Sequence, residues 1–362
     1  MATAGTAAAR SCDDRLVRHQ LVGATLLAMP LAGLTGAASP TPTPVFRLVD
    51  PSITESSGLA VSSYDDRVVY THNDSGDAAR FFAIDAGTGA TLASYRVPGA
   101  TNVDWEDMAA APEEAGRPSL WLADIGDNRG RRAEVVIYRV PEPRAPYRSG
   151  SSAAVTTLRL RYPDGPHDAE ALLVDSRRAA VYVATKSLSG QTSVYATQLR
   201  PAPASTLRLV ANVELGFGAA VTGGAVSRAG DRLVLRTYAE AYVWPLDVGG
   251  VPAALRAAPR RVPLPAMPQG ESVAFRADGS LLVGSEGSNS AVYAVRLPSP
   301  VRLTPGPTTR ARASTPEPRK RSPAGWSFLE AALVVAVATL VAGLGGWTVR
   351  RRRGRRAVRI RR

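Results

Sequence analysis

The chain has 362 residues, enough for one large or two ordinary domains, and a formal net charge of +13. The excess positive charge lies at the two ends, because residues 39–300 contain 26 Lys and Arg against 27 Asp and Glu, a net charge of about −1. The central part therefore has no basic excess with which to contact phosphates, and the composition argues against nucleic-acid binding.

Residues 1–38 predict an export signal peptide. Arginines precede a short apolar segment at residues 21–34, and small residues suited to cleavage follow at 35–39. The segment is too short to cross a bilayer comfortably and contains Pro30. An uncleaved anchor is the alternative. Cleavage would remove Cys12, the only cysteine, so the mature protein would have neither a disulfide nor a cysteine metal site.

Residues 45–298 repeat one order of short strands five times. The first strand of each repeat has a polar or acidic start: ESSGLAV from Glu55, WEDMAAA from Trp105, DAEALLV from Asp168, TGGAVSR from Thr222 and GESVAFR from Gly270. Two apolar strands follow each time, and a variable fourth follows in four repeats. Strands repeated every ~50 residues are typical of an all-β propeller, whose blades have strands a to d from the channel outward.

The fifth repeat lacks a fourth strand, and the chain has one strand to spare at its other end. The repeat ends at Leu297, whereas VFRLVD at residues 45–50 precedes the first strand a. We expect this segment to be strand d of the last blade, which would close the ring and remove its open edge. Five blades are therefore favoured, and a sixth blade in residues 140–166 is the alternative. In the fourth repeat, ALRAAPRRVPL from Ala254 is the expected strand d.

The segment after the repeats predicts membrane attachment. Residues 299–325 are rich in Pro, Thr and Arg and read as a stalk, because they have too few apolar side chains for a core. Residues 326–349 contain an apolar run long enough for one transmembrane helix. The basic residues 350–362 should stay cytoplasmic and contact anionic lipid. The expected location is thus the cell membrane, with an extracellular propeller that binds an unknown ligand or protein.

Three motifs carry a resemblance to a known group of proteins. These are HNDSGD at 72–77, DWEDMA at 104–109 and ADIGDN at 123–128. The chain resembles exported actinobacterial propellers of the WD40-like class, a group without an assigned function. It is more loosely similar to phytase-like and lactonase-like propellers. That looser resemblance implies calcium binding through acidic loops, but no motif transfers a catalytic role.

In a propeller, the d–a and b–c loops emerge on the same face, and we call this the top face. The repeat therefore predicts that acidic and polar side chains gather there. The expected d–a positions are Glu55, Asp104, Trp105, Glu106, Asp107, His167, Asp168, Glu170 and Glu271. The expected b–c positions are His72, Asn73, Asp74, Asp77, Asp124, Asp127, Asn128, Lys186, Tyr238 and Glu286.

Carboxylates and amide oxygens from several loops suit a hard cation such as Ca²⁺. The candidate metal ligands are Asp74, Asp77, Asp124 and Asp127, although Asp and Asn are also ordinary turn residues. Trp105 could plug the channel or pack between blades.

The acids of DWEDMA have two open roles. Glu106 and Asp107 could cap backbone amides or act as an acid/base pair.

The sequence leaves three functions open. The first is a membrane-anchored extracellular binding module that uses the acidic top face. The second is a cell-surface hydrolase of esters, phosphoesters or glycosides that uses carboxylates or Ca²⁺ on that face. The third is a structural scaffold of the envelope. Catalytic motifs such as G-x-S-x-G, H-E-x-x-H and the Walker loop are absent from the sequence.

Overall fold

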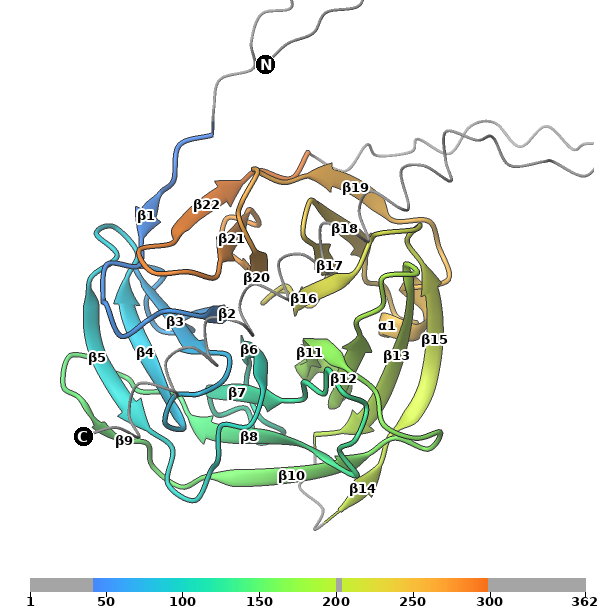
Figure 1. Cartoon of the computed structure of the whole chain (residues 1–362), viewed down its shortest axis with the longest axis horizontal. Coiled ribbons are helices and arrows are strands. Elements are labelled where there is room, and N and C mark those ends of the chain that lie inside the picture. Colours follow the sequence, from blue (N-terminus) through green and yellow to red (C-terminus); the bar gives the residue numbers. More distant parts are fainter. Residues whose placement is uncertain (1–41, 200–203, 299–362) are drawn as a thin grey trace, which may run out of the picture. The chain divides into compact units, whose positions relative to one another are not determined.

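The computed structural model describes residues 42–199 and 204–298, which form five sheets around a central channel (Figure 1). Blade 1 contains β2 (Ser56–Val61), β3 (Val68–Asn73), β4 (Arg80–Asp85) and β5 (Thr91–Arg96). Blade 2 contains β6 (Trp105–Ala110), β7 (Ser119–Asp124), β8 (Val135–Pro141) and β10 (Thr156–Arg161). Blade 3 contains β11 (Ala169–Asp175), β12 (Ala180–Thr185), β13 (Gln191–Gln198) and β15 (Arg208–Glu214).

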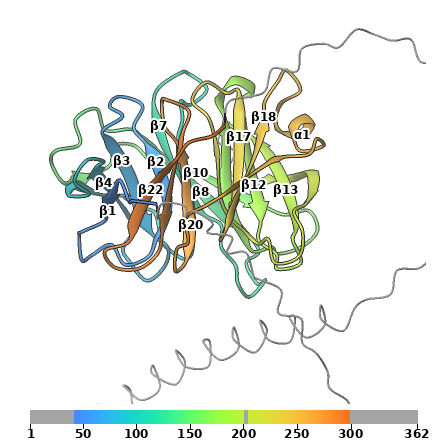
Figure 2. The same cartoon turned by 90° about the horizontal axis from the view of Figure 1, so that it is seen from above.

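The ring is completed by two further blades. Blade 4 contains β16 (Val221–Val226), β17 (Arg232–Thr237), β18 (Glu240–Pro245) and β19 (Arg260–Pro263). Blade 5 contains β20 (Gly270–Phe275), β21 (Leu281–Ser285), β22 (Ala291–Val295) and β1 (Phe46–Arg47). The a strands lie nearest the channel (Figure 1), and Figure 2 shows the ring from the side. The prediction of an all-β, five-blade propeller is confirmed.

The N-terminal strand closes the ring as the sequence predicts. β1 pairs antiparallel with β22, with Phe46 opposite Val292 and Arg47 opposite Ala291. The peptide N–H of Leu48 donates to the carbonyl of Ser290 and extends this contact. Strand d of the last blade therefore comes from the opposite end of the propeller sequence, and the first and last blades are held together by main-chain hydrogen bonds.

Two features differ from the expected pattern. The stretch from residue 140 to 166 forms no sixth blade; it supplies β10 and the short β9 (Gly150–Ser151), which pairs with the outer strand of blade 1. Likewise, β14 (Ser205–Thr206) pairs with the outer strand of blade 2.

The expected strand from Ala254 begins only at Arg260, because helix α1 (Gly250–Ala254) precedes it. A 3₁₀ turn, η1 (Ser176–Arg178), connects β11 to β12.

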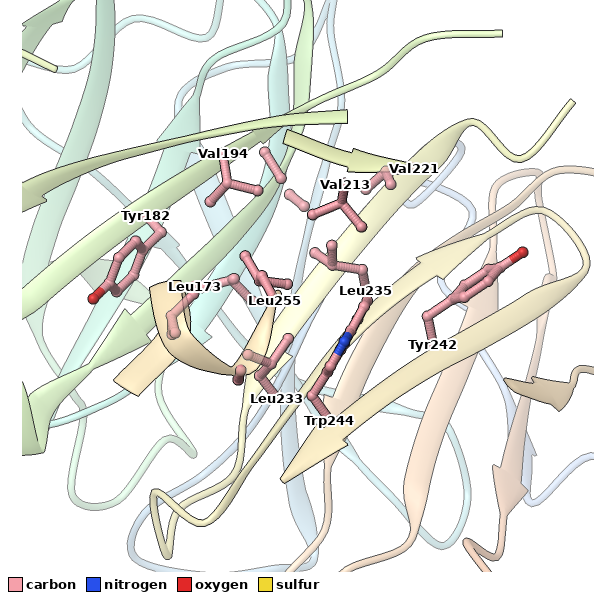
Figure 3. Packing of buried hydrophobic residues seen from close by; sticks show 14 of the residues in the cluster. Leu173, Tyr182, Val194, Val213, Val221, Leu233, Leu235, Tyr242, Trp244 and Leu255 are labelled. Atoms are coloured by element: carbon pink, nitrogen blue, oxygen red, sulfur yellow. The ribbon is translucent and has the colours of Figure 1, made fainter. Parts of the chain in front are cut away.

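Apolar side chains are buried between neighbouring blades, in one cluster for each of the five interfaces. Between blades 3 and 4, Leu173 and Val194 pack against Leu235 and Trp244, and Leu255 after α1 covers them (Figure 3). Because every blade is buried on both faces, its inner strands are almost continuously apolar, which explains their sequence pattern.

Several sequence predictions lie outside the described residues. These are the signal peptide at 1–38, the stalk at 299–325, the transmembrane helix at 326–349 and the basic tail at 350–362. Within residues 42–199 and 204–298, no helix has the length and apolar character that a membrane crossing requires.

The closure by β1 can be tested with the substitution Phe46→Ala. Phe46 is buried between blades 5 and 1, so its truncation should lower the free energy of unfolding by about 3–5 kcal/mol. Val49, three residues later, is exposed, and Val49→Ala should change it by less than about 0.5 kcal/mol. Urea unfolding measures both. Equal midpoints for the two variants would show that the ring does not depend on β1.

Candidate functional site

Each of the five a strands carries a β-bulge at its top-face end. The register shifts by one residue near the start of β2, β6, β11, β16 and β20, so the a strand has one residue more than its partner. A bulge of this kind re-aims a side chain at the rim of a sheet. The residues after the first of each strand are Ser57, Glu106, Glu170, Thr222 and Glu271, and we call them the bulge ring.

A second set of equivalent positions follows the b strands. The residue directly after each b strand is Asp74, Ile125, Lys186, Tyr238 or Glu286, and we call these five the outer ring. Main-chain bonds fix three of them in the same way. The N–H groups of Asp74, Lys186 and Glu286 donate to the carbonyls of Glu55, Asp168 and Gln269, which precede the a strands of the same blades. The two rings form the channel mouth, except for Ile125, which is buried in the apolar cluster between blades 2 and 3.

Carboxylates from different blades converge at this mouth. Carboxylate oxygens of Glu106, Glu170 and Glu271 lie within 4.8 Å of one another, and we call this set the inner triad. Oxygens of Asp74, Asp104 and Glu106 also lie within 4.8 Å of one another, and this set is the outer triad. Glu106 belongs to both. The bulges thus concentrate negative charge where the five sheets come closest.

The Glu106 carboxylate has no hydrogen-bond or salt-bridge partner among the described residues, although only 3% of the residue is exposed. Oxygens Asp74 Oδ1, Asp124 Oδ2 and Glu170 Oε2 are buried without a partner. A Cβ atom on Gly126 would lie 2.1 Å from Glu106 Oε1 and 2.6 Å from Asp104 Oδ2. Only a residue without a side chain leaves room for these carboxylates, and buried charges without partners are costly unless a cation joins them.

Burial and like charge raise the pKa values of these acids. Burial, with Asp104 as the next cause, raises the pKa of Asp74 to about 8. Burial and neighbouring carboxylates raise the pKa of Glu286 to about 9 and that of Glu106 well above its ordinary value. Burial also raises the pKa of Glu170 to about 8. Clustered perturbed carboxyls of this kind are typical of functional sites.

Asp107, the next residue after Glu106, has a structural role. Its Oδ2 accepts the N–H groups of Leu172 at 2.8 Å and Gly224 at 3.1 Å, and its Oδ1 accepts that of Met108. These three N–H groups lie at equivalent positions in the a strands of blades 2, 3 and 4, whose channel-facing edges lack a neighbouring strand. One buried carboxylate therefore joins three blades, as the amide-capping alternative predicts.

Below Asp107, the channel is lined by a-strand residues and by Arg228, with no carboxylate among them. A cavity of about 40 Å³ is lined mainly by Leu59, Val61, Met108, Val174 and Phe275 of the a strands. The acidic groups are therefore confined to the top-face end of the channel.

Three of the four predicted metal ligands have local partners. Asp77 pairs with Arg80 at 2.8 Å. Asp124 pairs with Arg132 at 2.7 Å. Asp127 accepts two main-chain N–H groups of its own turn. The structure groups only Asp74 of the four with other unpaired carboxylates, and metal binding by the set stays a prediction.

Trp105 and the two histidines lie apart from the mouth carboxylates. Trp105 is buried between blades 1 and 2 and donates its indole N–H to the carbonyl of Thr101, so it packs between blades. His72 is buried edge-on against Trp105, and burial lowers its pKa to about 4. His167 instead contacts Asp164 and Tyr195 beyond the mouth, so the two histidines are not brought together.

The remaining candidates have mixed positions. Asn73 accepts the N–H groups of Thr54 and Glu55 and thus fixes the loop before β2. Asp168 accepts the N–H of Asp127, and Asn128 lies exposed beside it. Lys186, Tyr238, Glu271 and Glu286 belong to the two rings.

Some mouth residues are missing from the sequence prediction. Ser57, Thr222 and Ile125 complete the rings, and Arg236 lies fully buried beside them, donating to the carbonyls of Ser272 and Gly284. The repeat alignment carries a signal for the ring positions, since they are equivalent in all five blades. Arg236 lies within the apolar strand RLVLRT, and this sequence carries no signal that the arginine lies beside the mouth.

Comparisons with known proteins give no family. No protein-family model matches the sequence, and no curated protein matches it. A glucose dehydrogenase structure aligns at 12% identity and a TM-score of 0.44, covering 72% of this chain and 100% of that one. The aldose sugar dehydrogenase of Escherichia coli aligns at 11% identity and a TM-score of 0.41, covering 70% and 98%. A nidogen/laminin complex aligns at 15% identity and 0.38, covering 64% and 73%.

The adjacent acids Glu106 and Asp107 should respond differently to isosteric amide substitution in EDTA. Glu106→Gln replaces a buried carboxyl that has no hydrogen-bond partner and whose charged form is disfavoured, so the free energy of unfolding should stay equal or rise. Asp107→Asn loses at least one acceptor for a buried N–H and should cost about 1–3 kcal/mol. Urea unfolding of both variants provides the measurement, and equal losses would contradict the assignment of separate roles.

The raised pKa values predict a pH dependence of the ion-free protein. The folded carboxyls keep protons that the unfolded chain loses near pH 4, so their contribution is full below pH 4 and is lost as pH rises through about 8 to 9. The melting temperature in EDTA should therefore fall between pH 7 and 9.5. The substitution Glu286→Gln should flatten this slope. A wild-type profile without a slope would refute the clustering of charge.

Proposed function

We propose that this propeller is a binding module whose acidic mouth holds a hard divalent cation, Ca²⁺ being the best match, and presents it to an extracellular ligand. The observation that carries the proposal is Glu106, a buried carboxylate that is shared by two triads and lacks a partner among the described residues. Oxygen-rich, anionic sites without nitrogen or sulfur ligands suit Ca²⁺ rather than a transition metal.

The outer triad fits such an ion in chemistry and in size. Calcium–oxygen distances are about 2.4 Å, so two ligand oxygens on opposite sides of one ion are at most about 4.8 Å apart. Asp74, Asp104 and Glu106 meet this limit, and the bare Cα of Gly126 leaves the space beside them. Three carboxylates leave coordination positions for water and for an oxygen of the ligand.

Exposed apolar side chains near the mouth support a binding role. Val103, Phe217, Leu188 and Tyr238 belong to d–a or b–c loops, and all four are exposed, Phe217 by 76%. The N–H of Gly218 donates to the carbonyl of Leu188, which ties two of these loops together. A partner that contacts the ion could bury these side chains.

The cellular setting of the proposal comes from the sequence. We infer that the propeller is exported, like the actinobacterial WD40-like group that its motifs resemble, and that it is carried on a stalk and anchored by one helix with a cytoplasmic basic tail. In that setting the top face would meet extracellular ligands at calcium concentrations that weak sites require.

A hydrolase is the second candidate, and the protonation of the mouth favours it. In the ion-free mouth, a carboxyl with a pKa of about 8, such as Asp74, can donate a proton at neutral pH. Turnover of an ester, phosphoester or glycoside that is lost in Asp74→Asn would support this role over simple binding. The scaffold alternative explains Asp107 but gives no reason for the unpaired Glu106.

Calcium binding should stabilise the protein. The melting temperature of the purified protein in EDTA should rise on adding excess Ca²⁺ and should saturate, with about 2.7 kcal/mol gained at 100 times the Kd. Gly126→Ala keeps every carboxylate but fills their space, so it should abolish the shift, whereas Asp77→Asn should retain it.

The opposite pattern would reject the proposed site. A wild-type protein without a shift at millimolar Ca²⁺ would remove a stabilising ion altogether. A shift that survives Gly126→Ala and disappears in Asp77→Asn would place the ion at the loop acids instead of the outer triad.

A further inference from the structure

Lys186 stands out among the ten residues of the bulge ring and the outer ring. It is the one basic side chain in the two rings, and the equivalent outer-ring positions of blades 1 and 5 hold the acids Asp74 and Glu286. The repeat therefore places a cation in blade 3 where two other blades place an anion.

The Lys186 ammonium lies against the inner triad. It forms a salt bridge with Glu170 Oε1, and it lies 5.4 Å from the centre of the Tyr238 ring. The main-chain N–H of Lys186 donates to the carbonyl of Asp168 at 3.0 Å, which fixes the base of the side chain. Only 20% of the Lys186 side chain and 3% of that of Glu170 are exposed. The Glu170 carboxylate and the Tyr238 ring thus contact the ammonium, and the main-chain hydrogen bond fixes the backbone that carries it.

The lysine leaves much of the inner triad unsatisfied. Glu170 Oε2 is buried without a partner, and the Glu106 carboxylate has none among residues 42–199 and 204–298. Glu271 has a 3.2 Å contact from Gln269 Nε2 and a longer one, 3.5 Å, from Ser57 Oγ. The Lys186 ammonium therefore faces three carboxylates, one of which, Glu170, has a buried oxygen without a partner, while the buried guanidinium of Arg236 lies near Glu271.

We propose that the inner triad of Glu106, Glu170 and Glu271 is a second divalent-cation site, which Lys186 closes by placing its ammonium where the ion would bind. This inference rests on the proposed function, because the two triads share Glu106 and would take the same class of ion. A dication and an ammonium a few ångströms apart in a buried site repel strongly, so only one of them can occupy the inner triad. Lys186 then sets the number of ions that the mouth holds.

The closure has a consequence for the ligand. With Lys186 in place, the mouth binds one ion in the outer triad. The Lys186 ammonium offsets negative charge in the inner triad. A ligand group that draws the ammonium away, such as a carboxylate or phosphate, would open the inner triad to a second ion. The site would thus favour anionic ligands that bring a second ion with them.

The test is the stoichiometry of Ca²⁺ binding to the full-length protein, measured by isothermal titration calorimetry at neutral pH after removal of metal. The wild type should bind one ion, and Lys186→Met, which keeps the length of the side chain without its charge, should bind two. Lys186→Arg keeps the positive charge and should bind one. The double variant Lys186→Met with Glu170→Gln should return to one.

The outcomes separate this inference from the proposed function. One ion in both the wild type and Lys186→Met would overturn the inner site and leave the outer site standing. No ion in the wild type but one in Lys186→Met would support the inner site and overturn the outer one. No ion in either would overturn both. If Lys186→Met fails to fold, Lys186→Gln replaces it with the same two-ion expectation.

Discussion

The single extra residue near the top of every a strand is the constraint on which the rest of the mouth depends. Without the bulge, side chains would alternate strictly between the two faces of the sheet, and this one would point into the core between two blades. With it, five equivalent side chains converge on the channel, three of them glutamates. The raised pKa values, the two carboxylate triads and the need for Gly126 all follow from this convergence.

The contrast between Glu106 and Asp107 shows how one acidic motif can serve two purposes. The bulge separates the two side chains, so Asp107 meets the free N–H groups of three a strands while Glu106 meets other carboxylates. A structural acid is recognised here by its main-chain donors, and a candidate functional acid by the lack of them. The same criterion sets aside Asp77 and Asp127, which accept main-chain N–H groups. Asp124 is intermediate, because one oxygen accepts the N–H of Asp104 and pairs with Arg132 while the other is buried without a partner.

The large-scale arrangement was readable from the sequence because a propeller repeats it. The unpaired strand at residues 45–50 and the three-stranded last repeat predict the closure by β1, and loop order predicts which acids share a face. The bulges were not readable, because a one-residue shift leaves the apolar pattern of the strand almost unchanged. Short strands such as β9 were missed because their partner belongs to the preceding blade.

The partners of individual acids were equally hidden. Nothing in the spacing of ADIGDNRGRR indicates that Arg132 neutralises Asp124 while Asp104, twenty residues earlier, stays beside Asp74 and Glu106. Side-chain partners across blades depend on rotamers and on the exact height of each loop. The sequence could therefore name the acidic face but could not divide its acids between structural and unpaired ones.

The most direct test of the central claim is a crystal structure grown with Mn²⁺, an oxygen-binding substitute for Ca²⁺ that can be located by its anomalous scattering. The claim predicts an anomalous peak between the carboxylates of Asp74, Asp104 and Glu106, with Lys186 still on Glu170. A mouth without a peak would contradict it. So would a peak confined to the loops of Asp77 or Asp127.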